Sequence, residues 1–224
     1  MSMADFEQIA FGSDDDFTTN PEPRCPCLLL LDTSHSMQGR PISELNRGIV
    51  AFKDELATDA LAMKRVEIAV LTFGPVNIDS GFQTPDYWKP PSFSTTGDTP
   101  MGQAIEQGLE MIRDRKQRYK DNGISYYRPW IFLITDGAPT DSWEHAAKRV
   151  RDGEKNNEFS FFAIGVGNAD MGILAQIAPR GPIKLDGLKF RELFMWLSSS
   201  LSRVSASSTG ERVALPPPTG WAEV

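Results

Sequence analysis

The chain has 224 residues, of which 40% are hydrophobic, and a formal net charge of −7. This length and hydrophobic content suffice for one substantial core, so we expect a single domain of α/β size. The acidic balance argues against non-specific binding of nucleic acid, which requires a basic surface.

The lack of targeting signals in the sequence and the small number of cysteines indicate a cytoplasmic protein. No apolar run approaches the roughly 20 residues that a membrane-spanning helix needs. Residues 1–16 carry acidic side chains and lack the basic-then-apolar order of a signal peptide. Cys25 and Cys27 are too few for a disulfide framework. We therefore expect a cytoplasmic protein without a membrane partner, and a flexible N-terminal segment over residues 1–24.

The first strong structural signal is the apolar run 27–31 (CLLLL), which ends at a polar segment. A continuous apolar run of this kind is typical of a buried strand followed by a loop. The spacing of Asp32, Ser34 and Ser36 allows three side-chain oxygens to converge above the strand end. Such oxygens are ligands that Mg²⁺ prefers. In the alternative interpretation the two serines only bond to backbone groups in a turn, and this segment alone leaves both open.

Downstream, strand and helix patterns alternate. The patterns predict strands at residues 66–73, 76–82, 130–134, 159–166 and 183–185. They predict helices at residues 42–56, 101–120, 143–155, 171–178 and 190–204. This alternation indicates a doubly wound, mostly parallel α/β sheet with helices on both faces.

The domain is expected to span residues 25–205 and to be followed by a flexible, Pro-rich tail over residues 206–224. The tail contains Leu215 followed by three prolines, and it reads as polyproline-like.

Two further polar loops precede a helix or follow a strand. Thr99 comes before Pro100, whose place at the start of a helix makes Thr99 the expected N-cap. Asp136 follows the predicted strand at 130–134. Each loop alone could be a simple cap or turn. Because binding groups in such sheets gather beyond the carboxyl ends of the strands, we expect these two residues to lie near Asp32.

Three dispersed motifs therefore stand in a defined order along the chain. They are Asp32-x-Ser34-x-Ser36, Thr99 in a Gly-x-Thr-Pro context, and Thr135-Asp136-Gly137. Together they resemble the metal-ion-dependent adhesion site of von Willebrand factor A domains, over roughly residues 25–205. The resemblance implies an antiparallel edge strand at residues 76–82. It also implies a metal site formed by Asp32, Ser34, Ser36, Thr99 and Asp136.

The cation implied by this resemblance is Mg²⁺, with Mn²⁺ or Ca²⁺ as alternatives, and Asp136 would contact it directly or through water. Asp98 departs from the Gly that is common at this place in the family, and we expect it to be a solvated loop residue. The segments 122–130, 161–167 and 190–197 resemble the bacterial tellurium-resistance-associated (TerY-type) subfamily. That resemblance implies a role in metal or chemical stress response beside a kinase and a phosphatase.

The ligand chemistry favours binding over catalysis. Because the inner oxygens are mostly those of neutral hydroxyls, a cation would keep much of its positive charge and could attract an Asp or Glu of a protein partner. We predict a metal-dependent protein-interaction module that is not an enzyme. A Mg²⁺-dependent phosphotransferase or phosphatase is the alternative, but Ser34 stands where such an enzyme needs a second acid after Asp32. A metal-free structural interaction domain is the third possibility.

Overall fold

The fold is built on a central six-stranded sheet with the strand order β3-β2-β1-β4-β5-β6. It is seen in a computed structural model that describes residues 16–222. The strands are β1 Cys25–Asp32, β2 Val66–Phe73, β3 Asn77–Gln83, β4 Trp130–Thr135, β5 Ser160–Gly165 and β6 Ile183–Lys184. Every neighbouring pair is parallel except β2 and β3. The predicted α/β fold class and the antiparallel edge strand are confirmed.

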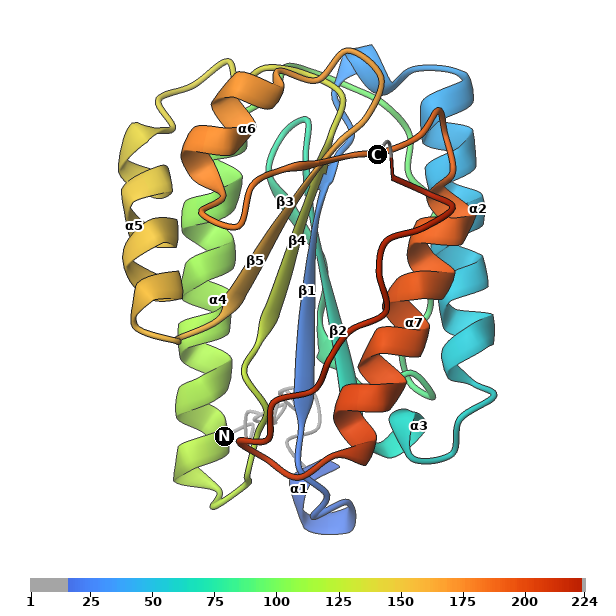
Figure 1. The fold of residues 1–224 in the computed structure, drawn as a ribbon, viewed down its shortest axis with the longest axis vertical. Coiled ribbons are helices and arrows are strands. Elements are labelled where there is room, and N and C mark those ends of the chain that lie inside the picture. The colour runs from blue at the N-terminus through green and yellow to red at the C-terminus, as the bar shows by residue number, and fades with distance from the viewer. Residues whose placement is uncertain (1–15, 223–224) are drawn as a thin grey trace, which may run out of the picture.

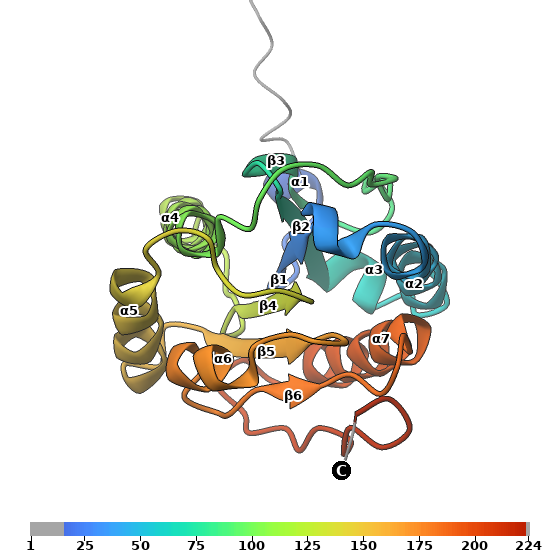
Figure 2. The same cartoon turned by 90° about the horizontal axis from the view of Figure 1, so that it is seen from above.

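Helices cover both faces of this sheet. The longer ones are α2 Arg40–Leu56, α4 Met101–Asp121, α5 Glu144–Lys155 and α7 Phe190–Ala206. The short ones are α1 Asp16–Thr19, η1 His35–Met37, α3 Ala62–Arg65 and α6 Met171–Ile177. Helices α2 and α7 lie on one face, and α4, α5 and α6 lie on the other (Figures 1 and 2). None of the helices within residues 16–222 is both long and apolar enough to cross a membrane.

Strand β1 lies in the middle of the sheet, and all eight of its residues are buried. Leu29 and Leu31 pack in the core beneath α2 and α7, whereas Leu28 and Leu30 pack in the core beneath α4 and α5. Helix α4 approaches so closely that a Cβ added to Gly108 would lie 2.9 Å from Leu30 Cδ2. Covering both faces explains why this strand reads as an uninterrupted apolar run.

A buried cluster of charged side chains lies at the amino-terminal ends of β1 and β2. The Glu67 carboxylate accepts hydrogen bonds from Arg24 Nε at 3.0 Å and from Arg115 Nε at 2.8 Å. The Tyr119 hydroxyl also donates to Glu67, and burial raises the pKa of this tyrosine. Burial disfavours the charged form of Arg115, but the hydrogen bonds and attraction of Glu67 hold its pKa above the usual value. The Phe17 ring covers both guanidinium groups, with Cζ atoms 5.4 and 4.8 Å from its centroid.

The two ends of the chain differ from what their composition suggests. Of the N-terminal segment predicted to be flexible, residues 1–15 lie outside the described part, and α1 packs its Phe17 against Tyr119. Residues 207–222, expected in a flexible tail, run back along α7 to the loop after β6 (Figure 1). There the Trp221 side chain is 1% exposed. This packing differs from the expectation because Trp221 buries a large apolar side chain. A composition rich in Pro and Ser does not reveal the effect of one such residue.

We expect Glu67→Ala to lower the free energy of unfolding by about 3–5 kcal/mol, because it leaves two buried guanidinium groups without their counter-charge. Urea unfolding followed by circular dichroism measures this loss. Glu55→Ala, which removes an exposed acid near the end of α2, is the matched control and should cost less than about 0.5 kcal/mol. Equal, small losses in the two variants would show that the cluster does not hold β1, β2 and α4 together.

Candidate functional site

The candidate site lies at the edge of the sheet where β1 and β4 end. These strands are parallel neighbours, so the loops that follow them emerge side by side. Ser36 Oγ donates to Asp136 Oδ1 at 2.6 Å, and the hydroxyl oxygens of Ser34 and Ser36 lie 2.9 Å apart. A Cβ added to Gly137 would lie 3.5 Å from Thr99 Oγ1 and 3.7 Å from Ser36 Oγ. The fold therefore brings together side chains from three loops that are far apart in the sequence.

Asp32 is the buried acid of this site and is 0% exposed. Its Oδ1 accepts a hydrogen bond from the Ser34 amide at 2.8 Å, and its Oδ2 accepts one from Thr135 Oγ1 at 2.5 Å. Burial raises the pKa of Asp32, the hydrogen bonds from Ser34 and Thr135 counteract that rise, and the negative charge of Asp136 adds to it. Burial also raises the pKa of Asp136. Two carboxylates in a poorly hydrated place would be stabilised by a cation.

The loop that carries Thr99 is fixed to the loop after β1 by backbone hydrogen bonds. The His35 amide donates to the Gly97 carbonyl at 3.1 Å, and the Thr96 amide donates to the Thr33 carbonyl at 2.9 Å. Gly97 has a φ of +67°, a left-handed conformation that glycine adopts without steric cost. Thr99 itself is 5% exposed. The position of Thr99 is therefore fixed by its burial and by the backbone hydrogen bonds that hold its loop.

The predicted role of Thr99 as the N-cap of the following helix is wrong. Helix α4 begins at Met101, with Pro100 in the N-cap place and no side-chain cap from the adjacent residues. The Asp141 carboxylate accepts hydrogen bonds from the amides of Gly102 at 2.9 Å and Gln103 at 2.8 Å instead. A carboxylate is better placed than a hydroxyl at the positive end of a helix, and the Thr99 hydroxyl is left to face the site.

Asp141 is the residue of this region that the sequence patterns miss. It lies 39 and 38 positions from the amides it binds, so no local motif signals the contact. Its loop also fits closely against α4, because a Cβ added to Gly102 would lie 2.2 Å from the Ser142 carbonyl oxygen. Asp141 therefore positions the start of α4, and with it the loop that holds Thr99.

The five predicted site residues supply only oxygen atoms. Asp32 and Asp136 provide carboxylates, and Ser34, Ser36 and Thr99 provide hydroxyls. Among residues 16–222 no group of three or more His, Cys, Asp or Glu side chains is arranged to hold a metal ion. A cation at this edge of the sheet would thus depend on the hydroxyls as well as on the two acids. This donor set suits a hard divalent cation such as Mg²⁺ and does not suit a softer metal.

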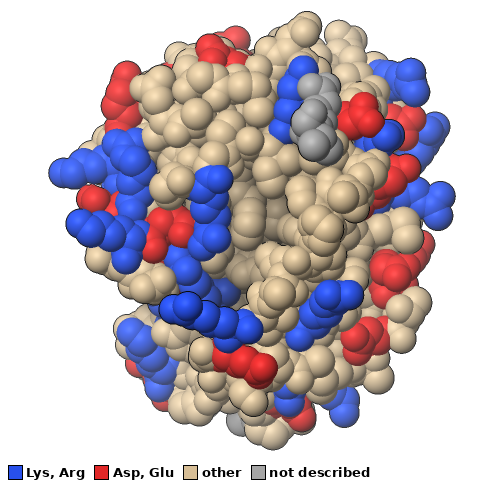
Figure 3. Space-filling view, in the orientation of Figure 1, with Lys and Arg blue, Asp and Glu red and all other residues tan. Residues whose placement is uncertain are grey.

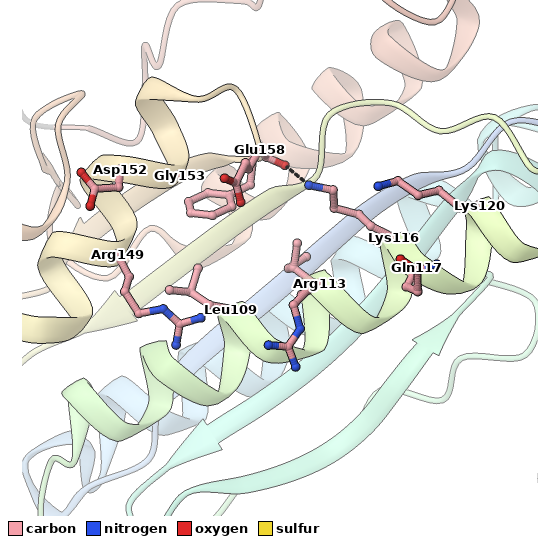
Figure 4. A pocket seen from close by; sticks show the side chains of 11 residues that line it. Leu109, Arg113, Lys116, Gln117, Lys120, Arg149, Asp152, Gly153 and Glu158 are labelled. Atoms are coloured by element: carbon pink, nitrogen blue, oxygen red, sulfur yellow. Dashed lines mark hydrogen bonds between the residues drawn. The ribbon is translucent and has the colours of Figure 1, made fainter.

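A separate cavity of about 310 Å³ lies between α4 and α5 (Figure 4). Its floor is apolar and includes Leu109, Ile112 and Phe159. Its charged rim is largely engaged within the protein: Arg149 pairs with Glu110 at 2.6 Å, and Lys116 Nζ donates to the carbonyl of Glu158 at 3.2 Å. No site residue lines this cavity. It separates two helices and is not an extension of the site.

Part of the chain is similar to a known domain family. Residues 89–185 match the von Willebrand factor type A domain. That match includes Thr99 and Asp136, whereas Asp32, Ser34 and Ser36 precede it. The sequence matches no curated protein.

Several solved structures share the fold at low identity. The pilus adhesin SpaC from Lactobacillus rhamnosus GG is 14% identical, with a TM-score of 0.64 over 81% of this chain and 31% of the adhesin. Proximal thread matrix protein 1 from the mussel byssus is 16% identical, with a TM-score of 0.56 over 81% of this chain and 48% of that one. The ArnB paralog VWA2 from Sulfolobus acidocaldarius is 18% identical, with a TM-score of 0.50 over 81% and 45%. The chain thus spans less than half the length of each of these structures.

We expect Asp141→Ala to lower the free energy of unfolding by about 1–2 kcal/mol, because two amides of the first turn of α4 lose their acceptor. Chemical denaturation measures the change. Asp54→Ala, which removes an exposed acid from α2, serves as the matched control and should leave stability unchanged within about 0.5 kcal/mol. An Asp141 variant as stable as the control would show that the contact is not a cap in solution.

Proposed function

We propose that this chain is a protein-interaction module of the von Willebrand factor A type that depends on a divalent cation. The cation would be Mg²⁺, with Mn²⁺ or Ca²⁺ as alternatives. The observation that carries this proposal is the convergence of two carboxylates and three hydroxyls at one edge of the sheet. The residues in this proposal are Asp32, Ser34, Ser36, Thr99 and Asp136.

The five proposed ligand side chains differ in exposure, so the site has a buried inner side and a more exposed outer side. Asp32, Ser34 and Thr99 are buried, whereas Ser36 is exposed and Asp136 is half-buried. A ligand would therefore approach past Ser36 and Asp136. The existing hydrogen bond between these two shows that the hydroxyl can turn toward a negative oxygen.

When bound, a divalent cation supplies a positive centre that a carboxylate can approach. Two negative side chains and three neutral ones would leave the cation attractive to a further negative group. The proposed partner is thus a protein that presents an Asp or Glu side chain, and the attraction is strengthened by the partly dehydrated rim. The two acids hold the cation, and the hydroxyls orient it without adding negative charge.

The wider biological role is proposed from the fold and from the sequence. Two of the structures that share the fold are a pilus adhesin, SpaC, and a thread matrix protein of the mussel byssus, and these names are consistent with a binding role. A role in tellurium or chemical stress, beside a kinase and a phosphatase, is proposed from the resemblance of three sequence segments, and a cytoplasmic location from the sequence signals described above. The absence of catalysis is likewise proposed, from Ser34 standing in place of a second acid.

We expect Mg²⁺ and Mn²⁺ to bind the intact chain in isothermal titration calorimetry. Asp32→Ala should weaken binding roughly 100-fold or more, since even the outer partners of metal ligands contribute about 10–100-fold. Asp98→Ala is the matched control, because Asp98 is an exposed acid next to Thr99 and should leave metal affinity nearly unchanged. Circular dichroism of each variant checks that the fold is retained.

No detectable binding by the wild-type chain would refute the metal site and favour a metal-free interaction domain. The same samples are assayed for hydrolysis of an aryl phosphate. Turnover that needs Mg²⁺ and disappears in Asp32→Ala would instead support the phosphatase alternative.

We expect partner capture from a lysate to need the cation. Proteins retained by the immobilised chain in Mg²⁺ should be lost on adding a chelator and recovered when Mg²⁺ is restored. Ser36→Ala should reduce capture, because Ser36 lies on the exposed side of the site. Asp98→Ala should capture as the wild type does. Capture that is insensitive to the chelator and to Ser36→Ala would contradict a metal-bridged contact.

A further inference from the structure

The C-terminal segment, residues 207–222, crosses the face of the domain that carries α7 (Figures 1 and 2). Trp196 of α7 donates from its indole Nε1 to the carbonyl of Pro216 at 2.9 Å, and its ring lies 5.3 Å from that of Trp221. The segment ends on the loop after β6, where the Asp186 amide donates to the Trp221 carbonyl at 2.8 Å. It is thus held at its proline run and at its tryptophan.

Trp196 belongs to a group of packed rings that we call the aromatic row, formed by Trp130, Phe132, Phe162 and Trp196. Phe132 and Phe162 stack with centroids 4.6 Å apart, and Trp196 meets Phe132 edge-on at 6.4 Å. Phe162 and Trp196 are only partly buried. The same face has a hollow with largely uncharged walls, and Lys and Arg gather along its left and lower margins (Figure 3).

The proline run has a conformation suited to recognition by such a surface. Each proline fixes its own φ, and the residue before each proline is restricted to extended conformations. Leu215 and the three prolines after it therefore favour a polyproline II helix, whose carbonyls have no partner within the helix. An indole that donates to one of these carbonyls, beside aromatic rings, is a recurrent way of binding proline-rich segments.

We propose that Trp196 and the aromatic row form a docking site for a partner's proline-rich segment, and that this chain's own C-terminal segment occupies the site. The partner segment would carry a leucine before the prolines and an aromatic residue a few positions after them. Leu215 supports the first requirement, since it is partly buried and packs against the core under α7. The burial of Trp221 supports the second.

The occupied state is suited to exchange because one of its contacts is incomplete. The indole Nε1 of Trp221 is buried and has no hydrogen-bond partner among the described residues. A buried donor in that condition destabilises the packed state, because its lost hydration is not replaced by a hydrogen bond. Tethering raises the local concentration of the segment to about the millimolar range, so a weak intrinsic contact suffices to keep it in place. A partner segment whose aromatic residue has no buried, unpaired N–H group can therefore compete for the docking site.

The test uses the full chain and a fluorescent synthetic peptide with the sequence of residues 211–222. Trp221→Ala should release the chain's own segment, so fluorescence anisotropy should report binding at least about 10-fold tighter than to the wild type. Leu215→Asp weakens the same segment at a partly buried position and should act in the same direction. Adding Trp196→Phe to Trp221→Ala keeps a ring but removes the donor, and should weaken binding about fivefold to tenfold.

The matched control is the same peptide with its three prolines replaced by alanine, which should bind at least about 10-fold more weakly. All measurements are repeated with a chelator, which should change nothing, so this proposal and the cation-dependent function fail independently. Failure of the peptide to bind either released variant, or equal binding of the alanine peptide, would overturn the proposal. A wild-type chain that forms a dimer through exchanged segments would also overturn it, because the occupant would then be a second copy.

Discussion

The burial of β1 on both faces is the constraint from which the rest of the structure follows. Its alternate leucines enter two separate cores, so helices must cover each side of the sheet. A strand enclosed in this way can carry polar groups only at its ends. At one end Asp32 starts the candidate site, and at the other Arg24 joins the cluster around Glu67. The two polar regions are thus consequences of one apolar strand.

The candidate site combines rigidity with little negative charge. Its buried acid is held by an amide and a hydroxyl, and the Thr99 loop is tied to the loop after β1 through its backbone. The burial that raises the pKa of Asp32 also makes an added positive charge favourable. Because the remaining ligands are neutral, the cation that we propose for this site would stay available to another negative group.

The last residues show how a segment of ordinary loop composition can become part of the fold. Trp196 and Trp221 are separated by a stretch rich in Ser and Pro, yet their rings are in contact, so Trp221 packs against the end of the aromatic row. Proline reduces the conformational freedom that such a segment loses on docking, which lowers the free-energy cost of holding it in place. The same property makes a proline-rich segment easy to capture from another chain.

The local order of the chain by itself determined the alternating strands and helices, the mostly parallel sheet and the three motifs that supply Asp32, Thr99 and Asp136. Those signals are local, because side-chain periodicity and strand ends can be read within a few residues. Only the tertiary structure decided that Asp141 caps α4, that Glu67 gathers two arginines, and that Trp221 returns to Trp196. Each of these contacts joins residues more than twenty positions apart. Their partners are selected by the packing of elements, which no single segment of the sequence encodes.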